Sequence, residues 1–381
     1  MDTGHIRPLT SLRGIAAIYV FFHHLIVFFL RPVGEEVGAY TALLANGYLW
    51  VDFFFILSGF LLALLYGALI REKALSKKDF LIRRFARIYP LHLVVLLLFV
   101  MVQLALYLKG NSDAFSGQFS LADLWRSLFL VHAIQLHPTY TPWNGPSWSI
   151  SAEWCAYILF PLFVWLVYRL REGIRQIVFW VCGFTVLAVV ENATSRQLDL
   201  TGYLGLIRCF VEFSMGIMLY ATAYHSPLML KWLATSKSQL LLMLALLVSL
   251  HFERADLTSV ALMVLIVASV SRQETAVTRA LSHPWLFFLG TISYSIYMVH
   301  WLVFSLVDKA ARLAMGIEVR DIDSGLPLLA VILVCSGLVL ITSVLSFRLV
   351  EEPLRKWLPR VLGATDKQRD WKGNEQQNRS A

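Results

Sequence analysis

The chain has 381 residues, of which 58% are hydrophobic and only 15% are charged. Apolar runs recur along almost the whole length, which excludes a soluble globular domain and predicts an all-α, polytopic membrane helical bundle. The formal net charge of +8 suits anionic lipid at the inner leaflet of a cytoplasmic membrane, so nucleic acid is not required as a partner.

The hydropathy pattern predicts about ten transmembrane helices. Lysine and arginine are concentrated in alternate connecting segments, most densely in 71–88 and from Arg348 onward. This asymmetry predicts that both termini are cytoplasmic. Segment 124–136 is too short to cross and is expected to lie at the interface or to fold back. The predicted spans are 12–30, 47–70, 89–108, 152–170, 174–191, 203–223, 238–251, 257–271, 285–306 and 326–350.

We expect residues 1–358 to form one membrane-embedded domain. Residues 359–381 are polar, with a composition typical of a disordered cytoplasmic tail. The four cysteines stand singly in apolar stretches, a pattern that favours core packing over a disulfide framework or a metal site.

The first span contains ionisable residues that a bilayer disfavours. Arg13 and His24 are eleven positions apart, so a helix places them on one face with about 16 Å between them along the axis. His23 points about 80° away from that face. An ionisable group in hydrocarbon must be paired or must face a polar cavity. The pattern therefore predicts a polar path along this face.

The second and third spans add an acidic and a basic group. Asp52 lies near the outer end of the second span, and the Ser58–Gly59 pair favours close helix packing. In "KKDFLIRRFARIYPLH", helical spacing brings three arginines together, and Pro90 predicts a bend. The cluster suits a positive-inside anchor and bidentate phosphate binding about equally. These arginines are Arg83, Arg84 and Arg87.

Further polar residues lie in later segments. Ser149 and Glu153 share a face of the helix predicted to begin near Pro146, and Glu153 needs a partner from another helix. Arg208 and Glu212 are spaced to neutralise each other.

His300 lies near the middle of the ninth predicted span, where a satisfied core histidine is the commoner role. Buried Arg, His, Asp and Glu together fit a membrane enzyme or a transporter about equally. A scaffold without chemistry is a third class.

Six motifs in order from residue 11 to residue 355 decide between these classes. The chain resembles the acyltransferase 3 family of membrane-bound O-acyltransferases, through an Arg-x10-His pattern, a second-span signature, an Arg-x-x-Arg-Ile-x-Pro element and a Ser-x-x-x-Glu element. The stretches that carry the resemblance are LRGIAAIYVFFHH, VDFFFILSGFLL, RRFARIYP, WSISAEW, LGTISYSIYMVH and LVEEPLRK.

The resemblance implies transfer of an acyl group, usually acetyl, from cytosolic acetyl-CoA to a hydroxyl of a carbohydrate such as an exopolysaccharide, without a metal. His24 would either take the proton of the acceptor hydroxyl or become acylated itself. The alternative is a transporter that exports a glycan or an acylated small molecule. Some family members carry an appended extracytoplasmic domain; this chain ends soon after its last predicted span, so we expect it to act alone or with a separate extracytoplasmic partner.

The resemblance and the charges together give a set of candidate site residues. The catalytic candidates are His24, Arg13 and Glu153, and the coenzyme-binding candidates are Arg84, Arg87 and Arg13. The candidates for binding or orienting the acceptor are Glu35, Glu36, Asp52, Ser149 and His300.

Overall fold

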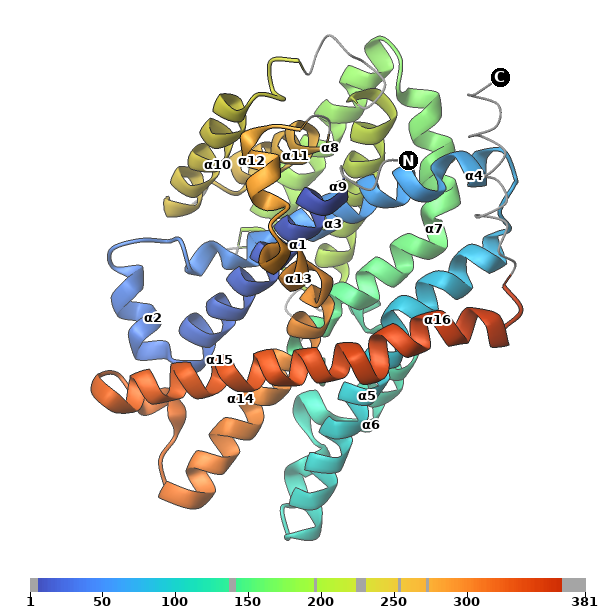
Figure 1. Cartoon of the computed structure of the whole chain (residues 1–381). Helices are drawn as coiled ribbons and strands as arrows, with labels where there is room; N and C mark the ends of the chain where they lie inside the picture. The colour runs from blue at the N-terminus through green and yellow to red at the C-terminus, as the bar shows by residue number, and fades with distance from the viewer. Residues whose placement is uncertain are drawn as a thin grey trace.

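The computed structural model describes residues 6–136, 142–194, 197–223, 231–252, 255–271 and 274–364. Within these ranges the chain is helical and contains no β-strand (Figure 1), which confirms the all-α prediction. The α-helices are α1 (Ile6–His23), α2 (Arg31–Gly38), α3 (Trp50–Leu62), α4 (Ala68–Arg71), α5 (Lys77–Leu108), α6 (Leu121–Leu128), α7 (Trp148–Leu170), α8 (Ile174–Asn192), α9 (Gly202–Ala223), α10 (Ser236–His251), α11 (Asp256–Val270), α12 (Ala276–Leu281), α13 (Pro284–Thr291), α14 (Ser293–Met315), α15 (Gly325–Ser346) and α16 (Glu352–Val361).

Seven helical stretches in the described part of the chain are long and apolar enough to cross a membrane. The pair α13 and α14 adds an eighth if it is one span bent by 61°, and α10 and α11 are apolar but shorter. These segments correspond to the ten predicted from hydropathy; the number that crosses, and the orientation, stay predictions. The seven stretches are Arg7–Phe29, Ala45–Arg71, Lys77–Leu108, Gly145–Leu170, Ile174–Asn192, Gly202–Thr222 and Gly325–Val361.

The third predicted span begins earlier in the structure than in the sequence prediction. The third span is one 32-residue helix, α5, that runs through Pro90 without ending there. At the C-terminus, α16 runs from Glu352 to Val361, and the end of the membrane domain at residue 358 stays a prediction. The predicted disordered tail falls mostly outside the described residues, because residues 365–381 are not among them.

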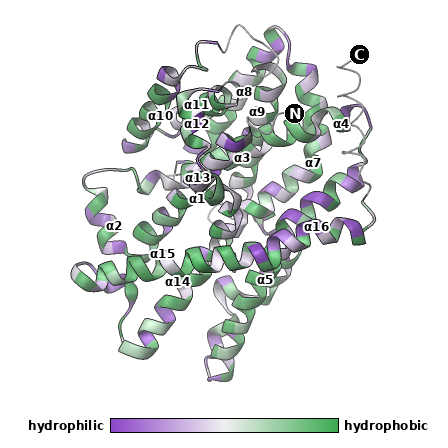
Figure 2. Ribbon diagram, viewed as in Figure 1, coloured by the Kyte–Doolittle hydropathy of each residue, from purple (hydrophilic) through white to green (hydrophobic). Residues whose placement is uncertain are grey.

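The helices differ in how deeply they are buried. In the apolar windows of α3 and α9, 61% and 72% of residues are buried, compared with 11% for α8 and 17% for the stretch that contains α15 and α16. The peripheral helices expose leucine, isoleucine and valine, as expected of surfaces that face lipid. Figure 2 shows this apolar colour along most helices, with hydrophilic residues gathered on α16 and the adjoining part of α5. The centre of the bundle is therefore α3 and α9.

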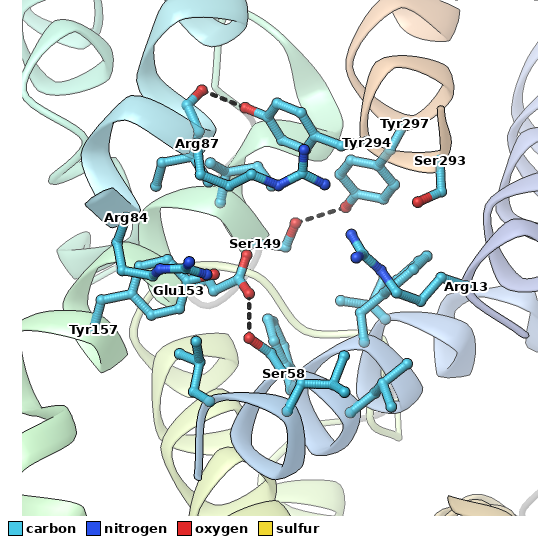
Figure 3. Close-up of a pocket in the computed structure, with 18 of the residues that line it drawn as sticks. Arg13, Ser58, Arg84, Arg87, Ser149, Glu153, Tyr157, Ser293, Tyr294 and Tyr297 are labelled. Carbon is cyan, nitrogen blue, oxygen red and sulfur yellow. Dashed lines mark hydrogen bonds between the residues drawn. The ribbon is translucent and has the colours of Figure 1, made fainter. Parts of the chain in front are cut away.

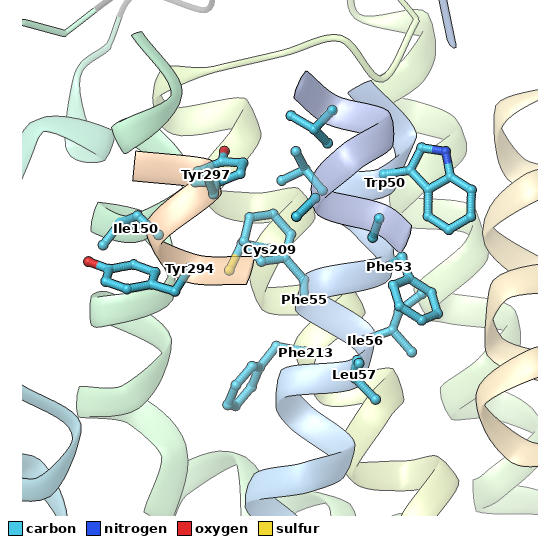
Figure 4. Packing of buried hydrophobic residues seen from close by; sticks show 14 of the residues in the cluster. Trp50, Phe53, Phe55, Ile56, Leu57, Ile150, Cys209, Phe213, Tyr294 and Tyr297 are labelled. Carbon is cyan, nitrogen blue, oxygen red and sulfur yellow. The ribbon is translucent and has the colours of Figure 1, made fainter. Parts of the chain in front are cut away.

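Glycine residues allow the central helices to approach closely. A Cβ on Gly59 would lie 2.0 Å from Phe213 O, and one on Gly216 would lie 2.0 Å from Ile56 O. The α3–α9 crossing thus depends on two glycines, which confirms the packing role predicted for the Ser58–Gly59 pair. Around this crossing, aromatic and aliphatic side chains close the core (Figure 4).

Three π-helical segments interrupt long helices in the part of the chain that the structure describes. They are His24–Phe29 after α1, Ala63–Gly67 after α3 and Phe347–Glu351 after α15. Such widened turns occur frequently at functional sites. Each of the three segments carries a residue of the site described next.

Candidate active site

A cavity opens between α1, α3, α5, α7 and α14. Figure 3 shows Arg13 projecting into it from the side opposite Arg84 and Glu153, with Arg87 and Tyr294 between them. Five of the candidate residues thus come together from three helices that are distant in sequence, α1, α5 and α7. The polar residues of this lining, the arginine cavity, are Arg13, Ser58, Arg84, Arg87, Ser149, Glu153, Tyr157, Ser293, Tyr294 and Tyr297.

Aromatic and acidic groups hold two of the three arginines. The Nη2 group of Arg84 donates to the Tyr66 hydroxyl at 3.0 Å, and its guanidinium lies 5.0 Å from the centre of that ring. Arg87 forms an ion pair with Glu351, whose other carboxylate oxygen accepts a hydrogen bond from Ser295 at 2.8 Å. Tyr66 and Glu351 both belong to π-helical segments.

Arg13 differs from the other two arginines. It forms no hydrogen bond or ion pair within the described part of the chain, yet it lines the cavity and is only partly exposed. A guanidinium offers five N–H donors in a fixed plane. Arg13 is therefore available to bind an anionic or oxygen-rich ligand in the cavity.

The acidic side of the cavity is Glu153. Its Oε1 atom accepts a hydrogen bond of 2.6 Å from Ser58 of α3, so its partner comes from another helix, as predicted. One turn earlier on α7, the Ser149 hydroxyl is hydrogen-bonded to the Tyr297 hydroxyl at 2.7 Å, and Pro146 O lies within hydrogen-bond distance of both. Ser58 thus combines helix packing with a polar contact in the site.

His24 is hydrogen-bonded to His300. Its Nδ1 atom lies 3.0 Å from Nε2 of His300, and Nδ1 of His300 lies 3.1 Å from Ile296 O. A carbonyl oxygen can only accept, so His300 donates from Nδ1 and, in its neutral form, accepts at Nε2. His24 then donates from Nδ1, and its Nε2 atom keeps a free lone pair.

His24 lines a second cavity, the histidine cavity, and not the arginine cavity. Val51 and Tyr297 line both cavities, so they form the wall between them. Arg13 and His24 therefore belong to one helix and to adjoining cavities. Besides apolar residues and Gly145, the histidine cavity is lined by His23, His24, Tyr48, Trp148, Asp199, Thr201, Arg208, Tyr297 and Trp301.

His23 is held more tightly than His24. It is 3% exposed, and its Nδ1 atom lies 2.6 Å from Leu44 O. A Cβ on Gly47 would lie 2.4 Å from the Cβ of His23, so backbone covers this imidazole. His24 is partly exposed, and the two neighbours differ in environment as their positions on the helix predict.

The structure corrects the predicted pairing of Arg208. Its ion pair is with Asp52 of α3, with 2.7 Å between Nε and Oδ1, and not with Glu212 of its own helix. Both partners are at most 1% exposed, so Asp52 is buried in the bundle, and it lines neither cavity. Glu35 and Glu36 lie exposed on α2 and also line neither cavity.

Sequence reasoning assigned no site role to several residues. Tyr66 and Tyr297 sit in apolar helices where a core or interfacial role is the ordinary interpretation, and Glu351 lies in LVEEPLRK, one of the six stretches that carry the resemblance. Asp199 lies in the polar connection between α8 and α9, where its only signal is a carboxylate close to a span. Among the described residues, no group of three or more His, Cys, Asp and Glu side chains is arranged to hold a metal ion.

Comparison with known proteins decides the family. The family model described as "Acyltransferase domain" matches residues 8–347, which includes both cavities. The chain belongs to the acyltransferase 3 family. No solved structure matches it.

Curated relatives of this family cover most of the chain. "Acyltransferase MdmB" of Streptomyces mycarofaciens is 31% identical over 78% of this chain and 79% of its own length. "Putative O-acetyltransferase SACOL0978" of Staphylococcus aureus (strain COL) is 26% identical over 92% of this chain, and "Peptidoglycan O-acetyltransferase OatA" of Listeria monocytogenes is 23% identical over 92%. The chain spans 58% and 56% of the length of the last two. These relatives and the apolar helices make the chain a multi-pass membrane acyltransferase.

Proposed function

We propose that the chain is an O-acetyltransferase that moves an acetyl group from cytosolic acetyl-CoA to a hydroxyl of a carbohydrate acceptor. The observation that carries the proposal is the His24–His300–Ile296 hydrogen-bond chain, because it leaves Nε2 of His24 unprotonated in a cavity that adjoins three arginines. A relative named as a peptidoglycan O-acetyltransferase supports the reaction type and a glycan acceptor.

The arginine cavity is the proposed donor site. Coenzyme A carries several phosphate charges, and arginine binds phosphate through paired N–H donors. Arg84 and Arg87 lie on the basic helix α5, and Arg13 has no competing partner among the described residues. The long pantetheine arm would then carry the thioester toward Tyr297 and the histidine cavity.

His24 is the proposed general base. Its Nε2 atom removes the proton of the acceptor hydroxyl while the oxygen attacks the thioester carbonyl carbon. The carbon–sulfur bond breaks, and the imidazolium returns its proton to the departing thiolate, so an ester and coenzyme A are the products. His300 is the proposed positioning residue, because its Nε2 atom fixes the ring orientation of His24. Glu153 would orient the bound thioester or acceptor from the arginine cavity.

We further propose that the chain lies in the inner or cytoplasmic membrane. Both termini would then face the cytoplasm, as the sequence predicts. The basic start of α5 then faces the cytosolic acyl-CoA pool. Reporter fusions after Lys78 and after Gly325 should report cytoplasmic and extracytoplasmic positions, respectively. An extracytoplasmic Lys78 fusion would contradict the scheme.

One experiment separates the transferase from a glycan transporter. Purified full-length protein in lipid nanodiscs is given radiolabelled acetyl-CoA and a panel of oligosaccharides. We expect one labelled ester for each free coenzyme A released, and loss of both products in His24→Gln. In proteoliposomes, glycan that crosses the membrane without any thioester consumption would favour the transporter.

A further inference from the structure

The histidine cavity contains a carboxylate that the reaction does not use. Asp199 lines the cavity, is partly exposed, and forms no hydrogen bond or ion pair with another residue in the described ranges. An unpaired carboxylate accepts hydrogen bonds strongly from hydroxyl groups. Asp199 is therefore a ready acceptor for a ligand that carries hydroxyls.

The second charged group of the cavity is already neutralised. Arg208 is 1% exposed, and its Nε atom is paired with Asp52. A second nitrogen donates to Leu198 O, and the guanidinium lies 5.4 Å from the centre of the Trp148 ring. Its Nη2 group has no partner in the described part of the chain. Arg208 is thus neutralised by Asp52, and the uncompensated charge in the cavity is negative.

An aromatic ring stands next to the proposed base. The Trp301 and His24 ring centres are 5.4 Å apart, and the rings meet at 80°. The edge of Trp301 packs on Gly145, where a Cβ would lie 3.0 Å from the indole ring. An indole face attracts the weakly positive C–H groups of a sugar ring through its quadrupole. A sugar that lies on Trp301 would have a hydroxyl within reach of His24.

We infer that the histidine cavity is the acceptor subsite, with Asp199 binding sugar hydroxyls and Trp301 lying against the sugar ring, and that it selects an uncharged sugar over an acidic one. This inference rests on the proposed function, which supplies the reaction at His24. The selectivity follows from charge, because the carboxylate of a uronic acid and that of Asp199 repel each other where little water separates them.

The test measures sugar binding without a donor. Purified full-length protein in nanodiscs is titrated by calorimetry with cellotetraose and chitotetraose as neutral probes and tetragalacturonate as the acidic probe. We expect a neutral probe to bind the wild type more tightly than the acidic probe. Asp199→Asn should raise the Kd of the neutral probe by about tenfold or more. The ratio between the Kd values of the acidic and the neutral probe should become smaller.

Asp323→Asn is the matched control, because Asp323 is an exposed aspartate in the connection before α15 and lies in neither cavity. It should bind all three probes as the wild type does. Equal binding by both variants, preference for the acidic probe, or binding of no sugar would overturn the inference.

The acyl-transfer assay separates this inference from the function on which it rests. If Asp199→Asn weakens sugar binding but the wild type transfers no acetyl group, the subsite holds and the proposed reaction is wrong. If transfer occurs and the acceptor KM is unchanged in Asp199→Asn, the reaction holds and the subsite is wrong. The donor KM should be the same in both aspartate variants.

Discussion

Arg87 and Glu351 are 264 positions apart in the chain and form an ion pair inside the bundle. The Glu351 side chain has no exposed surface, and that of Arg87 is 14% exposed. The pair joins α5 to the π-helical segment that precedes α16 and fixes one of the three arginines of the arginine cavity. The C-terminal helix is thereby connected to the proposed coenzyme site.

Glu351→Gln should therefore affect both stability and donor binding. Removing one partner of a buried ion pair costs about 3 kcal/mol or more, because the other charge stays buried without a partner. We expect a lower Tm and a higher KM for acetyl-CoA, with a smaller change in kcat. Glu352→Gln is the control, because its carboxylate is 39% exposed and pairs with the exposed Lys356. Equal Tm values for the two variants would contradict the structural role.

Arg84→Gln should raise the KM for the acyl donor. Replacing Arg84 and Arg87 together would also leave Glu351 unpaired, so the single variant isolates phosphate binding more cleanly. A charge-assisted hydrogen bond contributes about 1.5–3 kcal/mol, which corresponds to a rise in donor KM of about tenfold to a hundredfold. Lys78→Gln, at an exposed position of the same helix, should leave the donor KM unchanged. An unchanged KM in a folded Arg84 variant would place the coenzyme elsewhere.

Gly216→Ala should destabilise the centre of the bundle. The added methyl group would lie 2.0 Å from Ile56 O and 2.7 Å from the Phe60 nitrogen, so α3 and α9 would have to separate. Overpacking of this kind costs about 1–3 kcal/mol or more. Gly337→Ala in α15 is the matched control, because a Cβ there has no neighbour within 4 Å. Its Tm should equal or exceed that of the wild type, and a normal Tm for Gly216→Ala would contradict the close crossing.

Periodicity predicted relationships within one helix. The shared face of Arg13 and His24, the different environment of His23, and the alignment of Ser149 with Glu153 all depend on about 100° of rotation per residue. Arg13 and His23 lie in α1, and Ser149 and Glu153 lie in α7, where that rotation holds; His24 is the first residue of the π-helical segment that follows α1. The apolar segments were predictable for the same reason, because each is a local property of the sequence.

Relationships between helices were not predictable in this way. The contacts of His24 with His300, of Glu153 with Ser58 and of Arg208 with Asp52 depend on how each helix is rotated and shifted against its neighbours. Helical spacing alone favoured Glu212 as the partner of Arg208. The glycine crossing of α3 and α9 instead brings Asp52 to Arg208, and a local pattern contains no information about that crossing.

His24 and His23 provide the most direct test of the proposed chemistry, because they are neighbours in sequence with different contacts. Nδ1 of His24 carries the proton and donates a hydrogen bond to His300, so Nε2 of His24 keeps its lone pair. His23 is instead covered by Gly47 and lies 2.6 Å from Leu44 O. His24→Gln keeps hydrogen-bonding capacity and removes basicity, so kcat should fall by about 10²- to 10⁴-fold with the donor KM nearly unchanged.

The control is His23→Asn, which keeps a donor for Leu44 O. It should lower Tm and leave kcat nearly unchanged. His300→Gln should show an intermediate loss of kcat, because an amide can still accept the hydrogen bond from Nδ1 of His24 and position it. His300→Leu should lose more activity than His300→Gln, since it removes that acceptor. Acetyl transfer from labelled acetyl-CoA to an oligosaccharide, measured with each variant in nanodiscs, provides the comparison. An inactive, folded His23→Asn beside an active His24→Gln would remove His24 as the base.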